Sequence, residues 1–214
     1  MKIIEYLKSF NRKERFHLVG QLLGNCDFTL DPNIFGKLLV LMNLETPSYY
    51  YSAMDYHLDW IYASVVLASD NAIFPKERDN LCITATQEDV DFLIAFVDDT
   101  DVTHLIMIEA KGDTSFTNKQ IESKANRLKA IFGDDGFKWD KVQPHFVLCS
   151  PARPQLLNLD SIPAFMLNAK RDGFRWFRLY MPANQRKVTR CKENGKASKN
   201  GTYWKVDGIR LLDS

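Results

Sequence analysis

The sequence lacks the features typical of membrane proteins, of secreted proteins and of small domains stabilised by a metal ion. No apolar run approaches the roughly 20 residues needed to cross a bilayer. Charges at Lys2, Glu5 and Lys8 interrupt any signal-peptide core. The four cysteines lie far apart without Cys or His partners at zinc spacing, which argues against a disulfide scaffold or a structural zinc site. We therefore expect a soluble cytoplasmic protein with free thiols and no membrane partner.

Several motifs of well-known enzyme classes are absent as well. There is no phosphate-binding loop of the form G-x(4)-G-K-[ST], which argues against ATP hydrolysis by that route. Neither a G-x-S-x-G turn nor a G-x-G-x-x-G turn occurs. The histidines form no triad and no metal-binding spacing, so we expect each of them to be structural: His17, His57, His104 and His145.

The sequence does contain enough apolar material for one sizeable core. Of its 214 residues, 45% are hydrophobic and 12% are aromatic, a composition that excludes a mainly disordered chain. Apolar residues at helical spacing predict helices within the first 48 residues and over about 52–68 and 118–132. The polar segment 185–200 is predicted to be a loop. Strands are predicted at 81–86, 90–98, 103–111, 145–149, 174–181 and 201–212.

Positive charge is concentrated towards the C-terminus, although the net charge of the chain is only +1. Residues 1–169 hold 16 basic and 23 acidic side chains, whereas residues 170–205 hold 11 basic and 2 acidic ones. Such asymmetry indicates a polyanionic partner for the C-terminal part. A solvated basic surface would give the same pattern.

Two apolar runs joined by an acidic turn predict a hairpin with chemistry at its open end. If the hairpin is symmetric about Thr100, Asp91 pairs with Glu109. Cross-strand partners share a face with their Cβ atoms about 4.5–5.5 Å apart. Lys111 shares that face because it lies two residues beyond Glu109. We therefore expect two carboxylates and an ammonium group to lie together.

This trio has a chemical use in phosphate chemistry. Two adjacent carboxylates can hold Mg²⁺, which keeps several waters and favours phosphate as a further ligand. A bound metal ion polarises a phosphoryl oxygen and lowers the pKa of an attacking water. A lysine beside it can orient that water or stabilise charge that develops on the phosphate.

Asp91 followed by Glu109-Ala110-Lys111 resembles the D…(D/E)-x-K signature of the restriction-endonuclease-like nucleases, the PD-(D/E)XK superfamily. The predicted element order over residues 52–150, αβββαβ, is similar to the core of that superfamily. The resemblance implies that Asp91 and Glu109 bind Mg²⁺ or Mn²⁺ and that Lys111 is the catalytic lysine. Val90 stands where the signature has proline, and Asp89 is an alternative to Asp91.

The resemblance implies further site residues. Members often carry a polar residue early in the next helix, where Gln120 or Lys124 would lie. Many have an acidic residue on the first core helix, for which Asp59 is the candidate metal ligand and Asp55 the reserve. For Asp59, however, a structural role is the favoured explanation. An exposed pair at a strand end would also account for Glu109 and Lys111.

Contacts with nucleic acid are expected from the basic residues. Lys124 is a candidate, although a solvated helix face is the favoured explanation of Lys124 and Arg127. In the basic segment the candidates for phosphate contacts are Arg186, Lys187, Arg190 and Lys192. Aromatic residues interleaved with them could stack on unpaired bases, but we favour core positions for them: Phe174, Trp176, Phe177, Tyr203 and Trp204.

Together these patterns predict an α/β protein with a restriction-endonuclease-like αβββαβ core and a central mixed sheet. Helices are expected over residues 1–48, the nuclease-like core over 49–165, and a basic β-containing extension of the same domain over 166–214. The function expected is hydrolysis of DNA phosphodiester bonds by a Mg²⁺- or Mn²⁺-dependent nuclease. The alternative is a nucleic-acid-binding or assembly protein of the same fold without turnover. The resemblance leaves a homodimer open.

Overall fold

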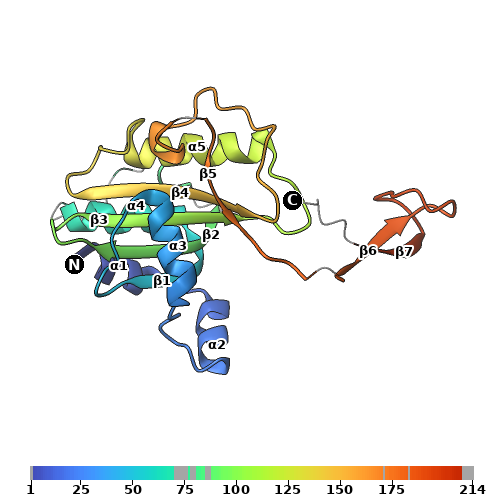
Figure 1. Cartoon of the computed structure of the whole chain (residues 1–214), viewed down its shortest axis with the longest axis horizontal. Helices are drawn as coiled ribbons and strands as arrows, with labels where there is room; N and C mark the ends of the chain where they lie inside the picture. Colours follow the sequence, from blue (N-terminus) through green and yellow to red (C-terminus); the bar gives the residue numbers. More distant parts are fainter. Residues whose placement is uncertain are drawn as a thin grey trace.

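The computed structural model describes residues 2–69, 77, 81–84, 88–170, 172–182 and 184–208. The chain is a mixed α/β protein built on a five-stranded central sheet (Figure 1). The helices are α1 (Lys2–Phe10), α2 (Glu14–Leu22), α3 (Pro32–Met42), α4 (Leu58–Ser69), α5 (Asn118–Phe132) and the 3-10 helix η1 (Ala164–Met166). The strands are β1 (Tyr51–His57), β2 (Asp89–Val97), β3 (Thr103–Ala110), β4 (Val142–Ser150), β5 (Arg175–Arg178), β6 (Arg186–Cys191) and β7 (Tyr203–Gly208).

The region 52–68, predicted as one helix, divides into a strand and a helix. Residues Tyr51–His57 form β1, which pairs antiparallel with β2, and the helix begins only at Leu58. Tyr56 is fully buried, and its hydroxyl donates to the carbonyl of Leu7 at 2.7 Å. Pairing with β2 and burial of most of the first residues of the strand therefore override the helical spacing of the apolar residues.

The strand predicted over 81–86 is not seen in the part of it that the structure describes. Residues 81–84 form a turn and irregular chain, and residues 85 and 86 lie outside the described residues. The outer partner of β2 is β1 instead. The strands of the central sheet are ordered β1-β2-β3-β4-β5. Neighbours are antiparallel as far as β3, whereas β3, β4 and β5 are parallel.

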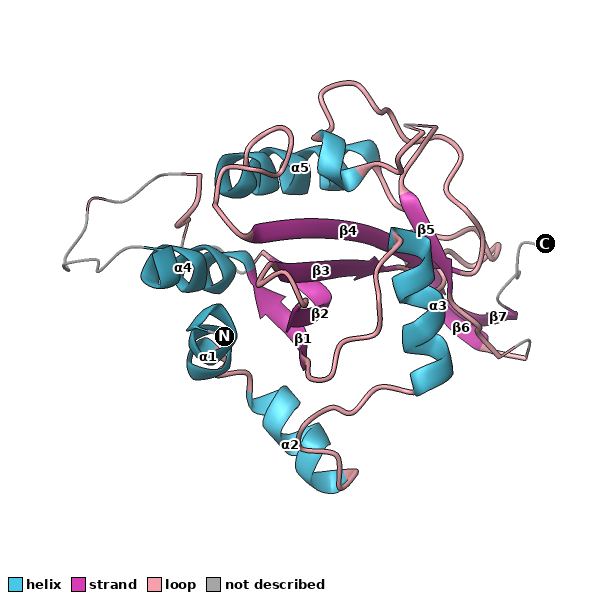
Figure 2. Cartoon of the chain, turned by 60° about the vertical axis from the view of Figure 1, so that its left-hand side comes forward, coloured by secondary structure: helices cyan, strands magenta, loops and turns pink. Residues whose placement is uncertain are grey.

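Both faces of this sheet are buried. Leu93, Ala95 and Met107 pack on one face against a large core that includes residues of α1, α4 and α5. Helix α3 lies on the other face (Figure 2). There Ile94 and Ile106 pack against its apolar side. Asp91 and Glu109 belong to the first face by strand alternation. Helix α5 therefore lies over the predicted site, as the next section shows.

The C-terminal part forms a separate two-stranded sheet. Strands β6 and β7 pair antiparallel and project from the rest of the protein (Figure 1). The prediction of a loop over 185–200 was therefore wrong for residues 186–191, which form β6. The preference for core positions was also wrong for Tyr203 and Trp204, which are 49% and 70% exposed, but right for Phe174, which is buried.

Among the helices in the described ranges, none is both long and apolar enough to span a membrane.

Candidate functional site

The open end of the β2–β3 hairpin has the predicted register. Phe92 pairs with Ile108, and the pairing continues to Val97 and Thr103. These pairs confirm symmetry about Thr100, and the same register continued by one residue sets Asp91 opposite Glu109. One carboxylate oxygen of Asp91, Oδ2, accepts a hydrogen bond from the backbone N–H of Ala110 at 2.6 Å. The carboxylate of Asp91 is thereby fixed against the end of β3.

Glu109 lies at the centre of the charged groups. Its side chain is only 13% exposed, and its Oε1 lies 3.6 Å from Nζ of Lys111. Its Oε2 accepts a hydrogen bond from Lys124. The pKa of Glu109 is raised because burial disfavours its charged form, an effect that Lys124 partly offsets and that the charge of Asp91 reinforces. The ammonium groups of Lys124 and Lys111 compensate the charges of the two carboxylates at this point.

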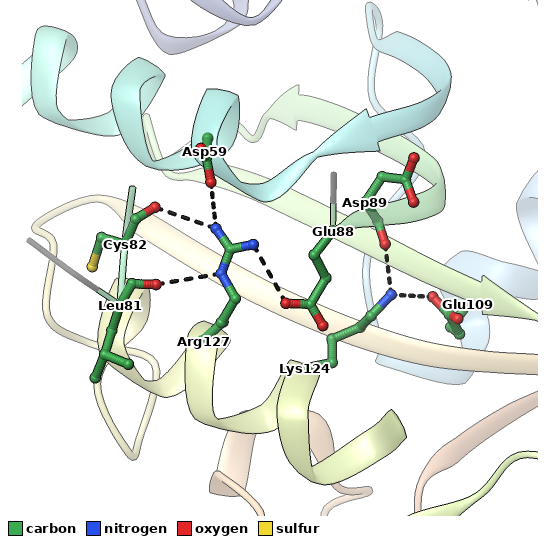
Figure 3. A network of polar contacts seen from close by, with 8 residues as sticks. All are labelled: Asp59, Leu81, Cys82, Glu88, Asp89, Glu109, Lys124 and Arg127. Atoms are coloured by element: carbon green, nitrogen blue, oxygen red, sulfur yellow. Dashed lines mark hydrogen bonds and ion pairs between the residues drawn. The ribbon is translucent and has the colours of Figure 1, made fainter. Parts of the chain in front are cut away.

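Lys124 reaches the site from helix α5, as Figure 3 shows. Its ammonium also donates to the backbone carbonyl of Asp89 at 2.6 Å, and its side chain is 8% exposed. The prediction that Lys124 lies on a solvated helix face was therefore wrong. A sequence signal was available, because Lys124 falls between Ile121 and Leu128 on the apolar stripe of the helix. A contact of Lys124 with phosphate would require this buried ion pair to open.

Arg127, one helical turn further along, joins a second ionic network (Figure 3). Its guanidinium pairs with Asp59 of α4 and with Glu88, the latter at 3.3 Å. It also donates to the carbonyls of Leu81 and Cys82. With its side chain 6% exposed, Arg127 is likewise not on a solvated face. Its role is to hold α4, α5 and the segment before β2 together.

The other predicted acidic residues lie apart from the pair. Asp59 pairs with Arg127, and Asp55 pairs with Arg15 at 2.9 Å. Asp89, the alternative to Asp91, points its carboxylate away from Glu109 in Figure 3 and pairs with Lys13 at 3.2 Å. Asp91 is thus the carboxylate that the structure brings to Glu109.

Gln120 lies in the first turn of α5. The hydroxyl of Thr117 donates to its side-chain oxygen at 3.1 Å and accepts from its backbone N–H at 3.4 Å. The side chain is exposed. Its contacts are those of a helix cap, and the predicted catalytic role of Gln120 rests on no contact with Asp91 or Glu109.

The basic candidates of the C-terminal segment, Arg186, Lys187, Arg190 and Lys192, are all exposed. The first three lie on β6, and Lys192 begins the turn that follows it. Nζ of Lys187 lies 2.6 Å from Oδ2 of Asp113, two residues beyond Lys111. This ion pair places the base of the β6–β7 hairpin beside the loop that leaves the site.

The carboxylates of Asp91 and Glu109 suit a Mg²⁺ site better than a structural zinc site. In the described part of the chain, no three or more His, Cys, Asp or Glu side chains lie close enough together to hold a metal ion. A structural zinc site of four protein ligands is therefore not formed there. Mg²⁺ needs less, since one or two carboxylates with waters and substrate phosphates are its usual ligands. Asp91 and Glu109 fit that requirement.

A second polar cluster occupies the opposite end of the same β2–β3 hairpin. His104 Nε2 lies 3.0 Å from Asp98 Oδ2, and His104 Nδ1 lies 3.0 Å from His145 Nε2. Both histidines are almost fully buried. The pKa of His145 is lowered to about 3, first by burial and then by the nearby His104 and Arg175. Hydrogen bonds thus hold both histidines inside the protein.

The chain matches none of the protein families, curated proteins or solved structures with which it was compared.

Proposed function

We propose that the protein is a metal-dependent nuclease that hydrolyses phosphodiester bonds of DNA at the Asp91–Glu109–Lys111 site. One observation carries the proposal: the strand register sets Asp91 opposite Glu109, with the ammonium of Lys111 3.6 Å from the Glu109 carboxylate. Two carboxylates and a lysine at the end of paired strands are what the D…(D/E)-x-K signature requires.

The topology supports the same proposal. From β1 to β4 the sheet has two antiparallel pairs followed by a parallel one, and α5 connects the parallel strands. This arrangement is similar to a restriction-endonuclease-like αβββαβ core. It departs from the predicted order because α4 lies between β1 and β2, and because β5 extends the parallel edge. We include this fold assignment in the proposal.

In the proposed reaction, Asp91 and Glu109 hold Mg²⁺ or Mn²⁺. The ion would polarise a phosphoryl oxygen and lower the pKa of the attacking water. Lys111 donates hydrogen bonds that orient this water or stabilise charge developing on the phosphate. Lys124 holds one oxygen of Glu109, so that the other faces Lys111. The chain thereby keeps the carboxylate in one orientation.

The test compares wild type with Glu109→Gln and with a matched control, Glu122→Gln, an exposed carboxamide substitution on α5. Mg²⁺ and Mn²⁺ binding is measured by calorimetry, and cleavage is measured on plasmid and single-stranded DNA. We expect Glu109→Gln to abolish both metal binding and cleavage, because the proposed reaction depends on the metal ion that Glu109 would hold. Glu122→Gln should behave as wild type. A wild-type protein that neither binds metal nor cuts DNA would refute the proposal.

A second candidate function is binding of nucleic acid without turnover. It is favoured by the buried ion pair of Lys124 with Glu109, which already neutralises the carboxylate. In that case DNA binding would be salt-dependent, unchanged by EDTA and unchanged in Glu109→Gln, and no cleavage would be seen.

A further inference from the structure

The β6–β7 hairpin exposes apolar side chains on one of its faces. Cross-strand partners share a face, so the pairs Val188–Val206 and Arg190–Trp204 lie on the same side. Val188 and Trp204 are each 70% exposed, and Val206 is 49% exposed. We call this side, with Arg186, the open face of the hairpin: Arg186, Val188, Arg190, Trp204 and Val206.

The opposite side of the hairpin is more covered at its centre. Thr189 and Lys205 are partly covered there, and Cys191 at the end of β6 is 3% exposed, whereas Tyr203 on this side is 49% exposed. The hairpin therefore leaves both of its valines and its tryptophan on the open face. Exposed apolar groups gathered on one face mark an interaction site.

Charge identifies the class of partner. Residues 184–208 contain seven basic and two acidic side chains, and neither acidic residue lies on the open face. Arg186 and Arg190 stand on the same side as the two valines and Trp204. Self-association through this face would bring two strongly basic hairpins together. A polyanion with apolar faces would pair with the basic side chains and also pack against the exposed ring of Trp204.

We infer that the open face of the hairpin binds single-stranded nucleic acid, with Trp204 stacking on an unpaired base and Arg186 and Arg190 contacting phosphates. Bases within a duplex are already stacked on one another, whereas unpaired bases have free faces for an indole ring. This inference rests on the proposed action on nucleic acid and specifies its substrate as a strand with unpaired bases.

The attachment of the hairpin connects this face with the proposed site. Lys187 pairs with Asp113 in the loop after Lys111. The segment that leads to the hairpin also contacts this loop, because a Cβ built at Gly112 would lie 3.1 Å from Cε of Met181. The base of the hairpin is thus held next to the loop that follows Lys111, with the open face on the side opposite to Lys187.

The experiment measures binding in EDTA, so that it does not depend on cleavage. The probes are a fluorescein-labelled oligothymidylate and a duplex of equal length, titrated at several salt concentrations. We expect Trp204→Ala to weaken oligothymidylate binding by about tenfold, the loss of one stacked base, with little change for the duplex. Tyr180→Ala is the matched control, since Tyr180 is 75% exposed but lies outside the hairpin, and it should bind as wild type.

The arginines are tested by the salt dependence of binding. Arg186→Ala with Arg190→Ala should lower the slope of log affinity against log salt, because fewer counterions are released. Removing two cations that lie outside the hairpin, Lys138→Ala with Lys141→Ala, should leave the slope unchanged.

Three results would overturn the inference: equal oligothymidylate affinity in Trp204→Ala and wild type, tighter binding of the duplex, or self-association that Trp204→Ala abolishes. Failure of the proposed function would show differently. If the protein binds oligothymidylate through Trp204 but never cleaves DNA, the inference about the hairpin holds and the proposed nuclease activity is refuted. If it cleaves DNA and binds equally well without Trp204, only the inference about the hairpin is refuted.

Discussion

The two ends of the β2–β3 hairpin both bury ionisable side chains, and they stabilise them in different ways. At the open end, carboxylates face ammonium and guanidinium groups from α5, as in the pairs of Glu109 with Lys124 and of Asp59 with Arg127. At the turn end, Asp98, His104 and His145 form a chain of hydrogen bonds. The first end keeps opposite charges together in a small volume, whereas the second ends in a histidine that burial keeps neutral.

The difference shows in the direction of the pKa shifts. Burial raises the pKa of Glu109, so its contribution to stability is present at low pH and is lost as pH rises through the raised pKa. Burial lowers the pKa of His145, so stability is lost as pH falls below the pKa of the unfolded histidine. The two ends of one hairpin therefore respond to acid with opposite signs.

The largest loss of stability is expected from a substitution at the open end of the β2–β3 hairpin. Arg127→Met removes the guanidinium that pairs with Asp59 and Glu88 and that donates hydrogen bonds to two backbone carbonyls. We expect the free energy of unfolding to fall by about 3 kcal/mol, since removing one partner of a buried ionic network is strongly destabilising. Urea unfolding at neutral pH measures it.

Lys129→Met provides the matched control on the same helix. Lys129 pairs with Asp134, and both side chains are largely exposed. Its loss should cost under about 0.5 kcal/mol. If the two variants lost equal stability, the buried network would be no more important than a surface pair.

We expect the histidines at the turn end of the hairpin to make the free energy of unfolding depend strongly on pH. As pH falls below about 6.5, an unfolded His145 takes up a proton that the folded protein does not bind, because its folded pKa is about 3. The free energy of unfolding should therefore fall by up to about 1.4 kcal/mol per pH unit from this group. His145→Gln should reduce the slope, and His17→Gln, at an exposed position, should not. An unchanged slope in His145→Gln would show that His145 is protonated in the folded state.

The smallest loss of stability is expected from reversing the direction of the hydrogen bonds that join Asp98, His104 and His145. Asp98 can only accept, so His104 donates from Nε2 and, when neutral, accepts at Nδ1 from His145. Asp98→Asn presents an amide donor to His104 and should reverse both tautomers, at a cost of about 1 kcal/mol. Nitrogen NMR shifts of the two rings would report the reversal. Unchanged shifts in the Asp98→Asn variant would contradict it, because the introduced amide would then turn its oxygen, not its nitrogen, towards His104.

The sequence predicted the β2–β3 hairpin well because a hairpin is local. Symmetry about one turn residue was enough to place Asp91 opposite Glu109. The period of two also places Ile94 and Ile106 on the face opposite to Asp91 and Glu109, where they pack under α3. Both predictions depend on strand geometry alone.

The features that the sequence did not predict depend on distant contacts. β1 lies on β2 across more than thirty residues of chain, and only this pairing makes Tyr51–His57 a strand. Lys124 and Arg127 have the polarity of a solvated helix face, yet α5 lies over the carboxylate face of the sheet and buries both. Likewise, the apolar ring of Trp204 is typical of a core residue. It is exposed because β6 and β7 pair only with each other within the described chain.

The ion pair between Lys187 and Asp113 has a further consequence for binding. Both side chains are substantially exposed, so the pair stabilises the attached hairpin by under about 1 kcal/mol. If the hairpin binds nucleic acid as proposed, Asp113 would compete weakly with a phosphate group for Lys187. A bound strand would then exchange one anion for another at Lys187 with little change in free energy, and the pairing of β6 with β7 would be kept.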